Sequence, residues 1–142
     1  GLTSGIALAL EAQAPDLRVR PVEPKGFDDV TRSLVSGGIE RNNHMSGSIC
    51  DAVLTPAPGT ITFPILKRLC GAGIVVSDDE AMQAVALAFA RLKVVVEPGG
   101  AVALAAALFH GDEIEGDAVI AVATGGNVDA EVFRDALARF GG

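Results

Sequence analysis

A chain of 142 residues is long enough to bury one hydrophobic core, and a net charge of −7 argues against binding to nucleic-acid phosphates. Apolar residues make up 49% of the chain but aromatic residues only 4%, so we expect a core of Ala, Val, Leu and Ile. The longest apolar run, residues 101–109, is too short to cross a bilayer, and no signal-peptide pattern is present. We therefore expect a cytoplasmic protein without nucleic-acid or membrane partners.

The first half of the chain predicts two helices, one strand and a long loop. Apolar residues at helical spacing predict a helix that begins near Thr3 or Ser4, either of which could cap it, and stops at Pro15. Alternating apolar and polar residues predict a strand at about 17–22, and a second helix follows. Periodicity is lost from residue 39 to 60, which predicts a long functional or mobile loop.

The second half alternates helices and strands more regularly. Ser77 and Glu80 have the spacing of a capping box, in which the serine caps the amide three residues on and the glutamate reaches back. The helix they begin carries one apolar stripe. The other elements we predict are a helix at 61–70, a strand at 73–76, a strand-like run at 94–97 that could instead extend the preceding helix, and an apolar, buried helix at 101–110.

The last unit carries the strongest hint of a ligand site. Residues 118–123 are apolar without alternation, which predicts a strand buried on both faces, and Gly125 and Gly126 lead from it into a final helix. Alternating strands and helices favour an α/β fold with a three-layer, mostly parallel sheet and helices on both faces. Ligands of such sheets bind at the carboxyl ends of strands, where residues 124–127 would lie. Two glycines alone fit a simple tight turn equally well.

Two further groups of residues are chemically suggestive. The first residues of the chain head a helix, and free amides at a helix amino end can bind phosphate. Glu23, Asp28 and Asp29 follow a strand, so their carboxylates could hold a hard divalent cation or simply stabilise a helix dipole. No lysine has a sequence environment typical of a desolvated Schiff-base lysine, and there is no zinc spacing, Walker loop or Gly-x-Ser-x-Gly motif.

Several segments together resemble one family: Ser48–Ala52, Pro56–Pro64, Val75–Glu80, Val96–Ala101 and Thr124–Asp129. Taken in order, they are similar to segments of threonine/serine dehydratases, which are fold-type II pyridoxal-phosphate (PLP) enzymes and close relatives of serine racemase. The resemblance covers essentially the whole chain, and the joint order is more specific than any single motif.

The resemblance implies a set of binding residues. Gly1 and Leu2 match the amides that hold the PLP phosphate, and Thr124 matches a hydroxyl residue, usually serine, that hydrogen-bonds the pyridine nitrogen. Glu23, Asp29 and the carbonyl of Phe27 match a site for Mg²⁺, Mn²⁺ or Ca²⁺ that some members carry. No catalytic residue falls within the chain, because the resemblance places the Schiff-base lysine and the opposite-face serine upstream of the glycine loop.

The expected function derives from the resemblance. Residues 1–142 would be the carboxyl-terminal portion of the large PLP-binding domain, without the amino-terminal part of the enzyme. The intact enzyme would be a homodimer that releases a 2-oxo acid and ammonia from a small hydroxy amino acid, whereas this chain alone would be inactive. A serine racemase and a 3-hydroxyaspartate dehydratase fit the same residues. A non-catalytic folded module is the alternative from a different class.

Overall fold

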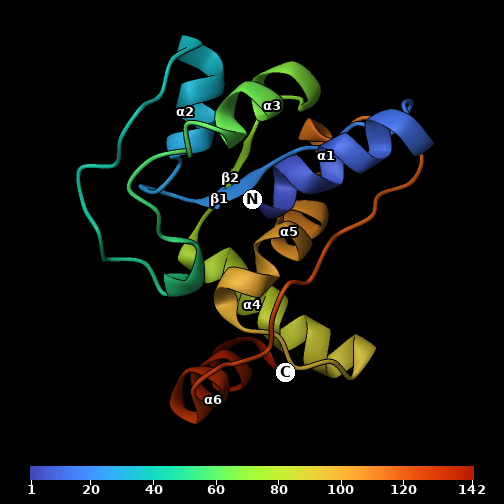
Figure 1. The fold of residues 1–142 in the computed structure, drawn as a ribbon. Coiled ribbons are helices and arrows are strands. Elements are labelled where there is room, and N and C mark those ends of the chain that lie inside the picture. Colours follow the sequence, from blue (N-terminus) through green and yellow to red (C-terminus); the bar gives the residue numbers. More distant parts are fainter.

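The computed structural model describes all 142 residues and shows alternating helices and strands around a small parallel sheet (Figure 1). Three short helical turns lie between the main elements. They are the 3₁₀ turns η1 (Asp51–Val53) and η3 (Gly111–Glu113), and the π-helical turn η2 (Ala88–Leu92). The main elements are α1 (Leu2–Gln13), β1 (Val22–Pro24), α2 (Asp29–Ser36), α3 (Thr62–Leu69), β2 (Ile74–Val76), α4 (Asp78–Leu87), α5 (Pro98–Phe109) and α6 (Ala130–Phe140).

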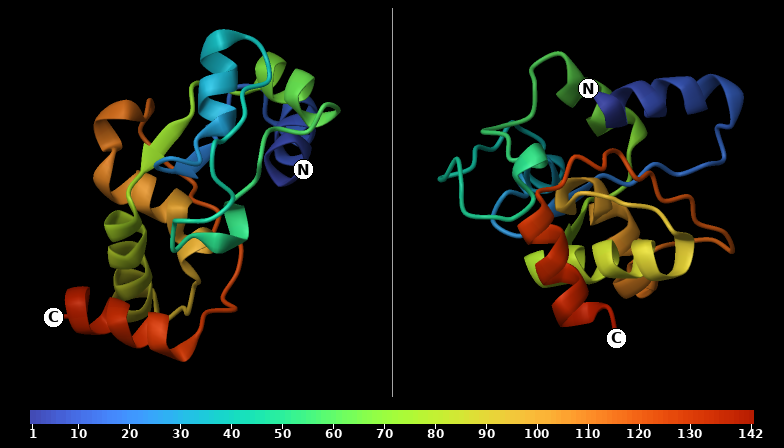
Figure 2. Two further views of the ribbon diagram at one scale, coloured as in Figure 1. Left: turned by 90° about the vertical axis from the view of Figure 1, so that its left-hand side faces the viewer. Right: turned by 90° about the horizontal axis from the view of Figure 1, so that it is seen from below.

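The sheet consists of two parallel strands. Val22 in β1 lies opposite Ile74 in β2, and an isolated parallel bridge joins Val19 to Cys70. Helix α5 contacts both strands and α2 contacts β1; in the left view of Figure 2 the strands lie between these two helices. The α/β class, the parallel pairing and helices on both faces are therefore confirmed. The strand predicted at 17–22 is present as β1 together with this bridge, and the strand predicted at 73–76 is β2.

The core lies between the sheet, α4 and α5, and is built of small apolar residues as the composition indicates. The capping box at the start of α4 is confirmed: Ser77 Oγ accepts from Glu80 N at 3.2 Å, and Ser77 N donates to Glu80 Oε2 at 2.7 Å. Pro98 begins α5, where its missing amide proton costs nothing. The buried cluster consists of Cys50, Ile74, Val76, Ala81, Met82, Ala84, Val85, Ala88, Val96, Ala101, Val102, Ala105, Ala106 and Ala136.

Helix α1 begins one turn earlier than Thr3 or Ser4 would require as caps. Gly1 precedes the first helical residue, and Ser4 lies inside the helix, where its hydroxyl donates to Gly1 O at 2.9 Å. The prediction that Thr3 or Ser4 caps this helix is therefore wrong. A serine in the first turn can donate its hydroxyl to a backbone carbonyl and still be part of the helix. Helix α1 contacts α3, and the two lie side by side in Figure 1.

The prediction of a strand at 118–123 is wrong. This segment belongs to no strand of the sheet, and most of its apolar side chains are exposed, with Ile120 at 79%. Its apolar character is real, but a strand also needs neighbours to pair with, and neither β1 nor β2 lies beside it in register. The strand-like run at 94–97 also has no regular structure; it follows η2 and a left-handed Lys93 with a φ of 60°.

The long loop is confirmed. Between α2 and α3 the only regular element is η1, and the loop begins at Gly37, whose φ of 78° favours glycine. No helix in the structure combines the length and the apolar character that crossing a bilayer requires.

Candidate functional site

The predicted ligand edge is formed by two glycine-containing segments that touch. Glu97 N donates to Gly125 O at 2.9 Å, and Thr124 N donates to Gly100 O at 3.4 Å. A Cβ on Gly100 would lie 2.5 Å from Gly125 O, and one on Gly126 would lie 2.6 Å from Val95 O. Gly100 and Gly126 are thus required by the close approach of two backbones, so Gly126 does more than form a turn.

This junction fixes Thr124 beside the amino end of α5. The Thr124 side chain is exposed, and its hydroxyl makes no hydrogen bond within the chain. A hydroxyl can donate or accept, so it is available to a ligand on this face. The residue that sequence reasoning missed here is Glu97: a Cβ on Gly125 would lie 2.5 Å from its Oε1, which places the carboxylate next to Thr124.

Gly1 and Leu2 lie at the amino end of α1. The first helical hydrogen bond is donated by Gly5 N to Gly1 O at 3.0 Å, so the amides of residues 2–4 precede it and have no helical acceptor. Leu2 is 57% exposed. These amides can therefore bind an anion. No hydrogen bond joins Gly1 or Leu2 to Thr124, and the two groups lie on different elements.

Glu23 ties β1 to the start of α2. Its Oε1 accepts from Val30 N at 2.9 Å, and its Oε2 accepts from Thr31 N at 2.8 Å and from Thr31 Oγ1 at 2.7 Å. Burial raises the pKa of Glu23 although these hydrogen bonds oppose the shift, and the negative charge of Asp29 raises it further. The carboxylate thus already satisfies free amides of the helix, and Oε1 keeps a lone pair for one more partner.

Asp29 is fully buried at the start of α2. Its Oδ1 accepts from Asn42 Nδ2 at 2.8 Å, and its Oδ2 accepts a long hydrogen bond of 3.4 Å from Thr55 Oγ1. Burial also raises the pKa of Asp29, against these hydrogen bonds and the attraction of Arg32. Two largely buried carboxylates that repel one another would be stabilised by a cation between them.

The oxygen atoms of Glu23, Asp29 and Phe27 are of the kinds that a hard cation takes. Gly26, with a φ of 86°, turns the chain between Pro24 and Phe27, and Phe27 O accepts no hydrogen bond from another residue. Carboxylate and carbonyl oxygens are what Mg²⁺ and Ca²⁺ prefer. No group of three or more His, Cys, Asp or Glu side chains in the structure is arranged to hold a metal ion, so a cation at Glu23 and Asp29 would also need the Phe27 carbonyl and water as ligands.

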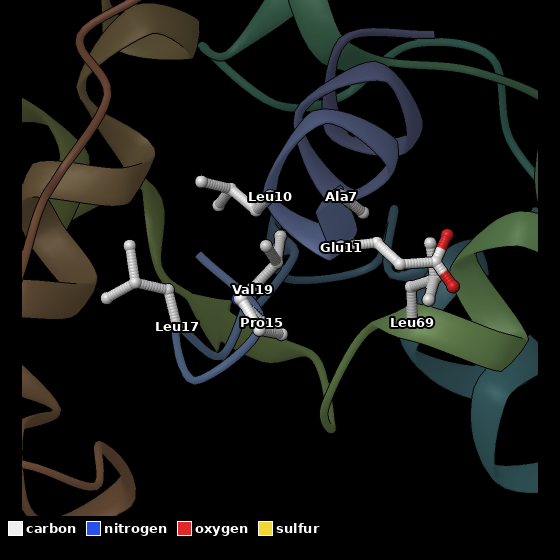
Figure 3. A pocket seen from close by; sticks show the side chains of 7 residues that line it. All are labelled: Ala7, Leu10, Glu11, Pro15, Leu17, Val19 and Leu69. Carbon is white, nitrogen blue, oxygen red and sulfur yellow. The ribbon is translucent and has the colours of Figure 1, made fainter. Parts of the chain in front are cut away.

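A separate apolar pocket lies away from these residues, between α1, the segment before β1, and α3. Its volume is about 100 Å³, and none of the candidate cofactor or cation residues lines it. Figure 3 shows Leu10, Val19 and Leu69 around it, with Glu11 at its edge. Glu11 is paired with Arg68, so no unpartnered polar group points to a ligand there.

A family model described as "Pyridoxal-phosphate dependent enzyme" matches residues 1–125 of this chain. A serine racemase from Dictyostelium discoideum is 39% identical over 134 residues, which cover 91% of this chain and 40% of the relative. An L-threo-3-hydroxyaspartate ammonia-lyase from Pseudomonas sp. is 36% identical over 137 residues, which cover 96% of this chain and 43% of the relative.

The fold has solved counterparts as well. The crystal structure of a threonine deaminase from T.th. matches with a TM-score of 0.85 and 39% identity, over 90% of this chain and 43% of that one. The chain therefore spans about 40% of the length of the curated relatives it matches.

Proposed function

Because this chain belongs to the pyridoxal-phosphate-dependent enzymes of fold type II, we propose that it contributes one side of the cofactor site of an ammonia-lyase acting on a small hydroxy amino acid. The intact enzyme would be a threonine/serine dehydratase. The observation that carries the proposal is the glycine junction, which holds the unpartnered Thr124 hydroxyl at the start of α5. The agreement of the ordered motifs with relatives that include a threonine deaminase supports it.

PLP, when bound, acts as the electron sink that makes the α-proton of an amino acid acidic. Within this chain, Thr124 would hydrogen-bond the pyridine nitrogen through its hydroxyl. A neutral hydroxyl leaves that nitrogen largely unprotonated, which favours loss of the β-hydroxyl over transamination-like chemistry. The free amides at Gly1 and Leu2 would hold the phosphate, since the amino end of a helix attracts anions.

The cation belongs to the same proposal. Glu23, Asp29 and the carbonyl of Phe27 would bind Mg²⁺, Mn²⁺ or Ca²⁺ at the junction of β1 and α2. Both carboxylates have raised pKa values, mainly from burial, and Phe27 O has no hydrogen-bond partner. A bound cation would compensate the buried charge and fix the start of α2.

A racemase is the second candidate, because serine racemases are among the relatives. Racemase and lyase share loss of the α-proton and differ in the next step, which residues outside this chain would decide. A chimera tests whether this chain completes a catalytic cofactor site: the amino-terminal portion of the T.th. threonine deaminase is joined to residues 1–142 at the point where the two chains begin to match.

We expect the chimera to release a 2-oxo acid and ammonia in equal amounts from L-serine, L-threonine or L-threo-3-hydroxyaspartate. Formation of the D-amino acid without ammonia, despite the amino-terminal portion of a deaminase, would show that this chain itself directs the reaction toward racemisation. A folded, PLP-loaded chimera without either product would support the non-catalytic module. The chain by itself, which lacks the Schiff-base lysine, should show no absorption band of lysine-bound PLP. Borohydride trapping at Lys25, Lys67 or Lys93 would contradict that expectation.

A further inference from the structure

Asn42 closes the base of the long loop. Asn42 N donates to Pro56 O at 2.9 Å, and Asn42 Nδ2 donates to Thr55 O at 2.7 Å. These two bonds join the segment entering residues 43–54 to the segment leaving them. Asn42 is therefore the point at which both ends of this excursion are held together.

The same side chain binds the buried carboxylate of α2. Asn42 Nδ2 also donates to Asp29 Oδ1 at 2.8 Å, and Asn42 Oδ1 accepts from Arg32 Nη2 at 2.6 Å. The carboxamide is held on both sides, by an acceptor at its nitrogen and a donor at its oxygen. Its orientation is thus determined by chemistry, and it can hold Asp29 in one rotamer.

One carboxylate oxygen of Asp29, Oδ2, remains available to a further ligand. Asn42 occupies Oδ1 with a bond of ordinary length, whereas the only partner of Oδ2 is Thr55 Oγ1 at 3.4 Å, at the limit of a hydrogen bond. Oδ2 is thus the oxygen that a cation would take. Outer hydrogen bonds that orient a ligating carboxylate contribute strongly to cation affinity.

We propose that Asn42 is a positioning residue for the cation at Glu23 and Asp29, and that it couples occupancy of that site to the order of residues 43–54. This inference rests on the cation site of the proposed function. When the cation binds Oδ2, Asp29 is fixed, and its bond to Asn42 then holds the two ends of the loop. Loop order and cation affinity must change together, because coupling is reciprocal.

The test uses the full 142-residue chain with Ca²⁺ or Mn²⁺ as the probe. Calorimetry measures the affinity, and hydrogen exchange followed by mass spectrometry measures protection of the amides of residues 43–54. Asn42→Ala is compared with Asn43→Ala, because Asn43 is the exposed neighbour and its side chain makes no hydrogen bond. Asn42→Gln, which moves the amide by one methylene, repeats the test if Asn42→Ala does not fold.

In the parent and in Asn43→Ala, we expect the cation to bind and to slow exchange in residues 43–54. In Asn42→Ala, we expect affinity to fall about 10- to 100-fold and the protection to be lost even at saturation. Equal affinity and equal protection in Asn42→Ala and the parent would overturn the inference but leave the cation site intact. A parent chain that binds neither cation would overturn both.

Discussion

The backbones of Gly100 and Gly125 touch: a Cβ on Gly100 would lie 2.5 Å from Gly125 O and 2.9 Å from Gly125 N. One glycine lies in the first turn of α5 and the other follows Thr124, so their contact fixes residues 124–126 to a buried helix. An added methyl group on Gly100 could not be accommodated by moving a side chain aside, because the atoms in contact belong to the backbone.

Gly100→Ala should therefore displace residues 124–126 and lower the free energy of unfolding by about 1–3 kcal/mol, the usual cost of forcing an extra methyl into a filled space. Gly5→Ala in α1 is the matched control, since a Cβ there meets nothing within 4 Å. It should be neutral or stabilise by up to about 1 kcal/mol. Denaturant unfolding of both variants checks this. Equal effects of the two substitutions would show that the junction is not tight.

Asp29 should make the stability of the chain depend on pH, and its burial sets the sign of that dependence. Because its pKa is raised in the folded chain, its contribution to stability is complete below the unfolded value of about 4 and is lost as the pH rises through the folded value. Relative to Asp29→Asn, the parent without cation should lose stability as the pH is raised from about 4 to about 8.

Asp28→Asn is the control for that series, because Asp28 lies at the start of the same helix but pairs with the partly exposed Arg32. Added Ca²⁺ or Mn²⁺ should restore the stability of the parent and of Asp28→Asn but not of Asp29→Asn. Unfolding curves at both pH values, with and without EDTA, provide the measurement. A parent and an Asp29→Asn variant that differ by the same amount at both pH values would contradict the burial argument.

The stability of the chain should also depend on pH through His110, which lies at the carboxyl end of α5. Its Nδ1 lies 2.8 Å from Glu113 Oε1 and its Nε2 lies 3.1 Å from Glu80 Oε1, which links the end of α5 to the capping box of α4. The hydrogen bond with Glu113, and then that with Glu80, raise the pKa of His110 although burial opposes them.

The stabilisation from protonated His110 is thus complete below the unfolded value of about 6.5 and disappears as the pH rises through the folded value. The unfolding free energy lost in His110→Gln should be larger at about pH 5.5 than at about pH 8.5, by roughly 1 kcal/mol or less for a partly exposed pair. His44→Gln, in the exposed loop, is the control for removal of a histidine. A loss that grows with pH would contradict the assigned ion pairs.

Local sequence signals predicted most elements. The capping box of Ser77 and Glu80 and the glycine at position 37 act within a few residues, so their pattern alone locates α4 and the end of α2. The segment at 118–123 shows the limit of such signals. Its pattern reports that the side chains are apolar, but whether it is a strand depends on partners, and the described chain supplies none.

Some residues of the candidate site could likewise be predicted from the sequence, and others could not. Thr124 and the two carboxylates could be selected because they stand in recognisable motifs. Asn42 and Glu97 could not, because their importance comes from contacts across the fold: Asn42 meets Asp29 thirteen residues away, and Glu97 lies against Gly125. An asparagine in a polar loop carries no sequence mark that distinguishes it from its neighbour Asn43.

Turnover of three Thr124 variants in the chimera tests most directly whether Thr124 faces the cofactor. Thr124→Ser should be close to silent, because the hydroxyl remains. Thr124→Ala removes one neutral hydrogen bond of roughly 0.5–1.5 kcal/mol, so turnover or PLP retention should fall by about tenfold or less. Thr124→Asp should stabilise the protonated pyridine nitrogen and shift products from the 2-oxo acid and ammonia toward transamination-like products.

The decisive readout is the ratio of ammonia to transamination-like product for each variant, measured with PLP at saturation. We predict an unchanged ratio for Thr124→Ser and a clear fall for Thr124→Asp. If Thr124→Ala and Thr124→Asp both keep the turnover and the product ratio of the parent, Thr124 does not face the cofactor.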